Sequence, residues 1–324
     1  MSPENPNVGV LLLWSDPRER QALLKILCAS GAHVTCDTPQ PNSAGFTMPP
    51  EGCRLIVFDF DSLRATAHPL LAEVTKLKHR PAVLVLTATR DKQDLIDLLA
   101  HDSLTNLIAK NVDFKANELI VTVQKILRDD IFGLEKYLTW GISPAEEIIT
   151  TSDAKGPVLD NLETYLNNIG CNRRLIGLAK SVADEFVMNA VYNAPVDAQG
   201  NAKYTSRMRS ENVHLEANEE ARFRYASDGI TLAMSIEDNF GRLERSTVLS
   251  YLRRCFIKGA DQIDQKEGGA GLGLYYIFES LNHLIINVAS NERTEMIGLM
   301  DISGSYREFA ERPKSLNIFL QERS

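Results

Sequence analysis

The sequence predicts an α/β protein of two domains, and three patterns support this prediction. The first half alternates short apolar runs with stretches whose apolar residues recur at helical spacing, as in a doubly wound parallel sheet. The second half carries a long amphipathic helix, two strands joined by an Asp-Gly turn, and further apolar runs towards its end. A length of 324 residues suits two domains of ordinary size.

Composition excludes several classes of protein. Lys and Arg number 35 against 43 Asp and Glu, and this net charge of −8 argues against a general nucleic-acid binder because no basic surplus neutralises phosphates. No apolar run approaches the roughly 20 residues of a membrane span, and the first residues lack the basic start and apolar core of a signal peptide. The cysteines form no CxxC pair, which favours reduced thiols in the cytoplasm: Cys28, Cys36, Cys53, Cys171 and Cys255.

Apolar runs and turn signals predict the elements of the first half. Strands are expected at residues 7–14, 54–61, 81–88 and 104–110, with a weaker one at 33–36. Asp16 and Pro17 open a helix that ends before Gly31, and a further helix is expected at 116–128. Residues 38–52 are rich in Pro, Gly, Asn and Ser, which predicts a long loop.

Three polar side chains lie at the carboxyl ends of predicted strands, where the functional groups of a parallel sheet collect: Asp59, Thr87 and Lys110. With these residues, the stretch 7–130 resembles the receiver domain of two-component response regulators. The resemblance implies that Asp59 accepts a phosphoryl group and that Thr87 and Lys110 contact it.

The acidic pair with which receivers hold Mg²⁺ after their first strand is missing. Trp14 and Ser15 stand at those positions, and Asp16 follows one residue late as a partial substitute. Because phosphoryl transfer between anions needs the cation, the sequence predicts a pseudo-receiver that keeps the fold without phosphorylation. From the residues alone, the alternative is that Asp59 ends its strand and caps the next helix.

A connector is expected between the two domains. Apolar spacing continues through residues 116–138, which predicts that the last helix of the first domain runs on into the connector. Turn-forming residues at 139–157 then mark the boundary. The predicted domains are residues 1–130 and 158–324, with a helical connector and linker over 131–157. The amphipathic connector forms either a dimer seam or a segment packed on its own domain.

The first motif of the second half lies on its amphipathic helix. Glu185, Asn189 and Tyr192 stand four and then three residues apart, which places them on one stripe beside the buried face. An amide oxygen is a suitable Mg²⁺ ligand, and a carboxylate can orient water or accept a proton. One edge of the helix thus carries groups that suit a metal-bearing ligand; from these residues alone, the alternative is an ordinary solvated helix face.

The second motif ends the strand pair whose turn is Asp228-Gly229. The second strand ends at Asp238, and Gly241 follows shortly. A carboxylate fixed at the end of a strand can accept a hydrogen bond from the exocyclic amine of adenine.

The third motif is a run of alternating glycines, Gly269, Gly271 and Gly273, at the start of an apolar helix. Glycines let the backbone approach phosphate closely, and a helix N-terminus presents free N–H groups. The spacing is neither the dinucleotide-binding fingerprint nor a P-loop, because no strand precedes it and no Gly-Lys-Ser/Thr follows.

In this order and spacing, the three motifs resemble the GHKL (Bergerat) ATP-binding domain over about residues 158–322. The resemblance implies a two-layer α/β sandwich in which Asn189 binds Mg²⁺ and Asp238 reads adenine. It implies a mobile lid at 257–268 and closing strands at 284–290, 294–302 and 315–320. The remaining residues that it assigns to the nucleotide are Tyr192, Asn193, Gly241, Gly269, Gly271, Leu272, Gly273 and Leu274.

Phe240 and Arg242 occupy positions at which the family carries glycine, so a reshaped adenine pocket is expected. None of the six histidines lies in the connector or in the helices of 158–194, which argues against a self-phosphorylating histidine kinase. The domain is more similar to the anti-sigma serine kinases. That resemblance implies ATP-dependent phosphorylation of Ser or Thr on a partner protein, with Glu185 as the catalytic carboxylate, and a homodimer by family habit.

A second function stays open at this point, a non-enzymatic switch in which ATP binding changes the contacts of a pseudo-receiver. Two departures from catalytic patterns favour it, Trp14-Ser15 and Phe240. A DNA-binding response regulator finds no support, because the nucleotide domain takes the effector position and no basic recognition helix stands out.

Overall fold

The computed structural model describes residues 9–38, 49–110, 116–209, 211–258 and 270–321. The chain is α/β, as the sequence predicts, and divides into two compact units. The first comprises Met1–Ile131 together with Ser315–Asn317, and the second comprises Phe132–Lys314 together with Ile318–Ser324.

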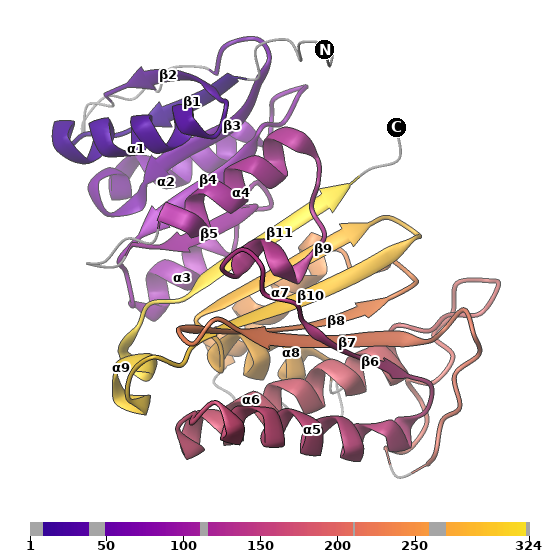
Figure 1. Ribbon diagram of the computed structural model, residues 1–324. Helices are drawn as coiled ribbons and strands as arrows, with labels where there is room; N and C mark the ends of the chain where they lie inside the picture. The colour runs from indigo at the N-terminus through magenta and orange to yellow at the C-terminus, as the bar shows by residue number, and fades with distance from the viewer. Residues whose placement is uncertain (1–8, 39–48, 111–115, 210, 259–269, 322–324) are drawn as a thin grey trace, which may run out of the picture. The chain divides into compact units, whose positions relative to one another are not determined.

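The first unit contains a parallel sheet of five strands in the order β2-β1-β3-β4-β5 (Figure 1). Its strands are β1 (Gly9–Leu13), β2 (His33–Asp37), β3 (Cys53–Asp59), β4 (Ala82–Thr87) and β5 (Asn106–Ala109). The apolar runs of the sequence therefore form strands where expected, including the weak one, and the doubly wound parallel sheet is confirmed.

Both faces of this sheet are covered, which explains why the strands β1, β3 and β4 are apolar and buried along most of their length. The helices are α1 (Pro17–Ala29), α2 (Phe60–Val74), α3 (Lys92–Leu98) and α4 (Ala116–Arg128). Leu23 and Leu27 of α1 and Leu119 and Val123 of α4 share one core with alternate residues of the strands. Helix α2 packs on β3 and β4, whose intervening residues are also buried.

Three residues of the C-terminal strand β11 (Ser315–Gln321) belong to the first unit, although the sequence assigns that strand to the second domain. Leu316 and Asn317 pair antiparallel with β5. The amide of Asn317 donates to the hydroxyl of Thr122 at 2.9 Å, and both residues are fully buried. The edge of the parallel sheet at β5 is thus capped by residues far away in the sequence, which no local pattern indicates.

The second unit contains an antiparallel sheet in the order β9-β10-β8-β7-β6. Its strands are β6 (Ala145–Ile149), β7 (Ala221–Ser227), β8 (Thr231–Asp238), β9 (His283–Ala289) and β10 (Arg293–Asp301). The predicted hairpin is confirmed as β7 and β8, with Gly229 at φ +86° in its turn. The edge strand β6 was not expected, because Ala145–Ile149 has neither alternation nor an apolar run.

Helices pack on one face of the antiparallel sheet (Figure 1). They are α5 (Lys155–Asn168), α6 (Arg173–Met188), α7 (Arg245–Lys258) and α8 (Ala270–Glu279), with α9 (Tyr306–Glu311) before β11. Helix α6 contacts β8 and β10, and α8 contacts β9; α5 packs on α6, and α7 packs on α8. Because α6 and α8 also contact each other, their ends bring two of the sequence motifs together.

The prediction of a helical connector is wrong. Helix α4 ends at Arg128, Asp129 has φ +55°, and only a short 3-10 turn follows at Leu134–Tyr137. Gly133 has φ +109°, which is incompatible with a continuous helix, and its N–H donates to Glu295 at 2.9 Å. The apolar residues of the segment, Leu134, Tyr137 and Leu138, are buried. Of the two alternatives for the connector, packing on its own domain therefore accounts for its apolar spacing.

Within the described ranges, no helix is both long enough and apolar enough to cross a membrane.

Candidate functional site

The first motif of the second unit lies where helix α6 changes geometry. Asn172 caps the helix start by accepting from the N–H of Arg174 at 2.9 Å, and the predicted apolar stripe is buried. At Asn189–Asn193 the α-helix gives way to a π turn, in which the N–H of Ala194 donates to the carbonyl of Asn189 at 3.0 Å. A π turn holds one more residue than an α turn, so it shifts the side chains that follow to other directions.

This shift separates residues that a straight helix would place on one stripe. Asn189 and Asn193 line one cavity. The side-chain amide of Asn193 donates to the side-chain oxygen Oδ1 of Asn189 at 2.7 Å. Tyr192, expected beside Asn189, is buried away from this cavity, and its hydroxyl donates to the carbonyl of Glu211 at 2.9 Å. Tyr192 therefore holds the following loop, and it does not line the cavity as its assignment to the nucleotide requires.

Asp238 stands at the end of β8, as predicted, with Thr294 of β10 directly opposite. Its carboxylate accepts from the N–H of Phe240 at 2.9 Å, and it also accepts from the N–H of Gly241 and from the Thr294 hydroxyl. Burial raises the pKa of Asp238 to about 6, although these donors act in the opposite direction. The carboxylate is thus fixed in place and is a good acceptor at neutral pH. Thr294 was not identified from the sequence, because its relation to Asp238 depends on strand pairing.

Gly241 supplies the backbone freedom that the loop after β8 needs. It has φ +57°, and a Cβ there would overlap the carbonyl oxygen of Ala289 and lie 2.8 Å from the N of Glu292. Its carbonyl accepts from the N–H of Asn291 at 3.1 Å, which holds the loop on the β9–β10 turn. The single glycine therefore makes the close approach, while Phe240 and Arg242 on either side of it line the cavity.

The cavity lies between α6 with its π turn, strands β8 and β10, and helices α7 and α8. Its polar lining consists of Asn189, Asn193, Asp238, Arg242, Tyr251 and Thr294, and its apolar lining of Ala190, Ala194, Ile236, Phe240, Leu243, Leu274 and Met296. Few polar groups around apolar walls are typical of a site for a small organic ligand. Of the residues expected at the nucleotide, Asn189, Asn193, Asp238 and Leu274 meet here, and Gly241 shapes the adjoining loop.

Glu185 lies one turn before Asn189 and contacts helix α8 instead of lining the cavity. A Cβ on Gly273 would overlap its carboxylate, so this glycine admits the Glu185 side chain to the start of α8. Burial raises the pKa of Glu185, and the charge of Asp184 adds to the effect, while Arg209 and Lys155 oppose it. The acid of the first motif and the last glycine of the third are thus in contact.

The remaining glycine-motif residues are placed only in part. Gly271 and Leu272 lie in α8, which begins at Ala270, and Gly269 lies outside the described residues. Of the expected lid at 257–268, Ile257 and Lys258 end α7, and residues 259–268 lie outside the described part.

The donor set suits a particular kind of metal binding. Among the described residues, no group of three or more His, Cys, Asp or Glu is placed to hold a metal ion. The amides of Asn189 and Asn193 still fit Mg²⁺, which keeps water and phosphate oxygens as most of its ligands and needs few from protein. These residues fit a cation that arrives with a phosphate ligand.

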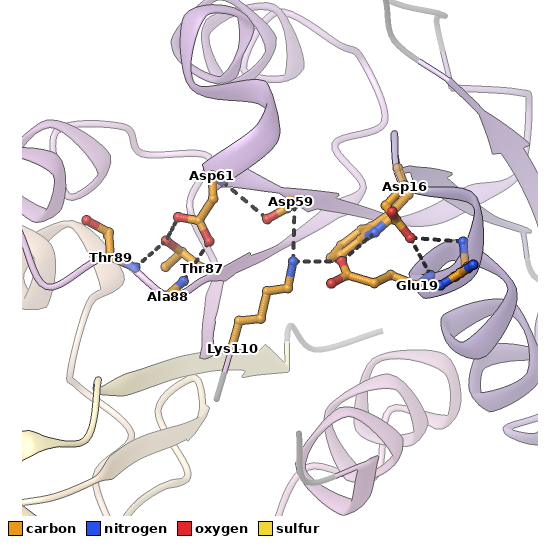
Figure 2. A network of polar contacts seen from close by, with 10 residues as sticks. Asp16, Glu19, Asp59, Asp61, Thr87, Ala88, Thr89 and Lys110 are labelled. Carbon is orange, nitrogen blue, oxygen red and sulfur yellow. Dashed lines mark hydrogen bonds and ion pairs between the residues drawn. The ribbon is translucent and has the colours of Figure 1, made fainter. Parts of the chain in front are cut away.

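Figure 2 shows the polar network at the carboxyl ends of β3, β4 and β5 in the first unit. The Lys110 ammonium lies 2.7 Å from Glu19 Oε2, 3.4 Å from Asp59 Oδ2, and 5.0 Å above the centre of the Trp14 ring. Burial lowers the pKa of Lys110, but the hydrogen bond to Glu19 and the charge of Asp59 give a net increase. Lys110 and Asp59 are therefore brought together as the sequence implies, with Glu19 as a further partner.

Thr87, expected to contact a phosphoryl group on Asp59, bonds instead to the carboxylate of Asp61. Its hydroxyl donates to Asp61 Oδ1 at 2.8 Å, and the N–H of Ala88 donates to Asp61 Oδ2 at 2.7 Å (Figure 2). Asp59 accepts from the N–H of Asp61 at 3.3 Å and caps α2, which is the alternative role considered for it. Asp61 was not identified from the sequence, because its role depends on the neighbouring strand. The available signal was a second acid two residues after Asp59, at the end of the same strand.

Asp16 serves as a helix cap in the structure. Its carboxylate accepts from the N–H groups of Arg18 and Glu19 at 2.9 and 2.8 Å, and the bond from Glu19 lowers the pKa of Asp16. Both bonds are made to Oδ1, so its predicted part in a cation site competes with a local role that already uses this oxygen.

No protein-family model matches the sequence, and no curated protein matches it.

Replacing Gly241 by alanine should destabilise the second unit far more than the same change at Gly229. Both glycines have positive φ, but a Cβ on Gly229 would meet no atom within 4 Å, whereas one on Gly241 would overlap backbone. We expect a loss of about 1 kcal/mol for Gly229→Ala from backbone conformation alone, and more than about 3 kcal/mol for Gly241→Ala. Calorimetric unfolding of both variants measures the difference; equal losses would show that the loop moves freely off the β9–β10 turn.

Proposed function

We propose that the second unit binds ATP with Mg²⁺ and uses it to act on a partner protein, in the manner of a GHKL-type kinase related to the anti-sigma serine kinases. One observation carries the proposal: Asn189 on the helix and Asp238 on the strand line the same cavity, from opposite elements. The helix-over-sheet arrangement and the order of the three motifs add support.

The Asp238 side of the cavity suits the adenine base. A deprotonated carboxylate accepts from the exocyclic amine, and its fixed position costs little ordering when the base binds. Ile236, Met296 and Leu274 offer apolar walls for the ring faces. Phe240 adds an aromatic side chain to the cavity lining at a position where the family has glycine. We therefore propose that the adenine site is altered in shape but retained.

The Asn189 side suits the phosphates. Asn189 and Asn193 would hold Mg²⁺, which supplies charge neutralisation at the phosphate oxygens. Helix α8 begins near this end, and its first N–H groups favour an anion. Gly273 keeps the helix close to Glu185.

Glu185 is the residue we assign to proton transfer from an acceptor hydroxyl. Burial raises the pKa of Glu185, which makes its carboxylate a stronger base than that of an exposed glutamate. In the second unit, His283 lies buried in β9 and His214 pairs with Thr151, so neither occupies a helix near the site. A hydroxyl on another protein is therefore the acceptor that we propose.

The first unit supports a receiver-like domain that does not accept phosphate. Its strand order, 2-1-3-4-5, is shared by flavodoxin-like folds, in which functional groups collect at the carboxyl ends of the strands. Lys110 is paired with Glu19, and Thr87 with Asp61, so both groups expected to contact a phosphoryl oxygen already have carboxylate partners. We propose that this unit mediates protein contacts.

Calorimetric titration with ATP, with and without Mg²⁺, tests the proposal directly. Asn189→Ala should weaken ATP binding in Mg²⁺ at least tenfold and remove the difference that Mg²⁺ makes, and Asp238→Asn should weaken it at least tenfold under both conditions, or about 1.4 kcal/mol. Asn167→Ala and Asp160→Asn on the exposed surface of α5 are matched controls and should bind like the wild type. Wild-type protein that binds no nucleotide would refute the proposal.

Binding of the base should also depend on pH through Asp238. With a pKa of about 6, this group is a carboxylate above pH 6 and loses its acceptor form about tenfold per pH unit below that value. Adenosine, which has no phosphates to titrate, should therefore bind with constant affinity from pH 7 to 8 and progressively more weakly below pH 6. Asp238→Asn should bind weakly with no such dependence, and an unchanged pH profile in this variant would contradict the assignment.

A second candidate function, an ATP-gated switch without transfer, is favoured by the internally paired Lys110 and Thr87. Transfer of labelled phosphate from ATP to candidate partners separates the two functions. As a kinase, the protein should lose at least 100-fold of its transfer rate in Glu185→Gln while ATP affinity stays unchanged, and Glu163→Gln, which pairs with Lys180 on the surface, should behave like the wild type. ATP binding without any transfer, together with altered affinity for a partner, would favour the switch.

A further inference from the structure

The loop between the π turn and β7 is built on a buried ion pair. Glu219 is 2% exposed, and its carboxylate binds the Lys203 ammonium and accepts from the Tyr204 hydroxyl at 2.9 Å. Lys203 also lies 2.9 Å from Glu216. These contacts draw the start and end of the loop together, so the intervening turn has a defined position.

The same loop is fixed to the π turn of the candidate site. The Thr205 hydroxyl donates to the carbonyl of Tyr192 at 3.2 Å, and the Tyr192 hydroxyl donates to the carbonyl of Glu211 at 2.9 Å. The N–H of Lys203 donates to the carbonyl of Pro195 at 2.9 Å. The buried position of Tyr192 therefore sets where the turn 204–209 stands relative to Asn189.

This turn displays two arginines with a methionine between them. Arg207, Met208 and Arg209 are all exposed, Met208 by 67% of its surface. The Arg209 guanidinium lies 4.8 Å above the centre of the Tyr192 ring, and its Nη1 donates to the carbonyl of Met188 at 3.4 Å. Met188 and Glu185 both lie in the last turn of α6, so this hydrogen bond holds Arg209 at the end of the helix that carries Glu185.

The charge of the turn is opposite to that of the protein. Residues 198–209 contain three basic residues and no acid, whereas the whole chain has a net charge of −8. Lys203 is neutralised by Glu216 and Glu219, so Arg207 and Arg209 provide the exposed charge. An acidic peptide complements this surface, with an apolar side chain against Met208. Nucleic acid is disfavoured, because two cations on an acidic protein neutralise few phosphates.

We propose that the turn 204–209, which we term the arginine turn, docks an acidic segment of the partner protein and brings a Ser or Thr beside it to Glu185. This inference rests on the proposed function. In the transfer step the hydroxyl oxygen of the acceptor bonds to the γ-phosphorus of ATP, and its proton passes to the Glu185 carboxylate. The bond from the γ-phosphorus to the bridging oxygen breaks, and ADP leaves with that electron pair.

Fluorescence anisotropy with two labelled peptides tests the arginine turn in the full chain. One peptide carries three glutamates on each side of a serine, and the other carries glutamines instead. We expect the glutamate peptide to bind, its affinity to fall with added salt, and the glutamine peptide to bind at least tenfold more weakly. Equal binding of both peptides, or binding of neither, would overturn the proposal.

Charge reversal locates the binding. Arg207→Glu with Arg209→Glu should weaken the glutamate peptide at least tenfold, and Arg207→Glu alone, which leaves Arg209 on Tyr192, at least threefold. The control is Arg307→Glu on α9, a residue that is 87% exposed and pairs with Glu311; it should change affinity less than twofold. An equal loss in the control would show that only overall charge matters and would refute the proposed surface.

Two further measurements complete the test. ATP affinity of the double variant should stay within about twofold of that of the wild type, because the two arginines do not line the cavity. ATP titration of the wild type tests the proposed function separately, so failure of docking and failure of nucleotide binding are distinguished. A labelled single-stranded oligonucleotide should bind more weakly than the glutamate peptide; tighter binding that depends on Arg207 and Arg209 would replace the peptide with nucleic acid and overturn the proposal.

Discussion

The candidate site depends on one half-buried carboxylate that is held by the backbone shortly after it. Asp238 ends β8, accepts from the N–H groups of Phe240 and Gly241, and faces Thr294 across the β8–β10 pairing. This arrangement exists only because Gly241 lies against the β9–β10 turn, where a side chain would overlap backbone. The position of the Asp238 carboxylate is thus set by the strand register and by the absence of a side chain at Gly241. This wall of the cavity is therefore fixed before a ligand binds. Preorganisation of this kind lowers the entropic cost of binding.

The two halves of the chain treat their charged groups differently. At the carboxyl ends of the parallel strands, Lys110 and Thr87 each bond to a carboxylate of the same unit. In the second unit, Asp238 is bonded by neutral donors only, and Arg209 contacts an aromatic ring and a carbonyl while it stays exposed. A charged group that forms no ion pair retains more of its field for a ligand. We therefore place the proposed ligand binding in the second unit.

Much of the fold was predictable, because buried strands and amphipathic helices leave periodic patterns in the sequence. The parallel sheet, the hairpin at Asp228-Gly229 and the helix bearing Asn189 all follow from such patterns. The predictions that were wrong or incomplete concern features that depend on contacts between residues distant in the sequence. Glu295, which lies 162 residues after Gly133, helps to fix a connector that was expected to be helical. Strand β6 forms because it pairs with β7, far away in the sequence. In the site, Thr294 and Asp61 needed strand pairing to be found, and Tyr192 was misplaced because no sequence signal indicated the π turn.

The π turn at residues 189–193 also determines which changes of chain length the site tolerates. An α-helix advances about 100° per residue, so deleting one residue from this turn would restore α-helical bonding and rotate the flanking segments relative to each other by that amount. Asn189 would then lose its hydrogen bond with Asn193. The hydrogen bond from Tyr192 to the following loop would either break or pull the end of the helix out of place. Single substitutions do not change the number of residues in the turn and so leave this rotation unchanged. Through this stretch, the chain is thus more permissive to exchange of side chains than to insertion or deletion.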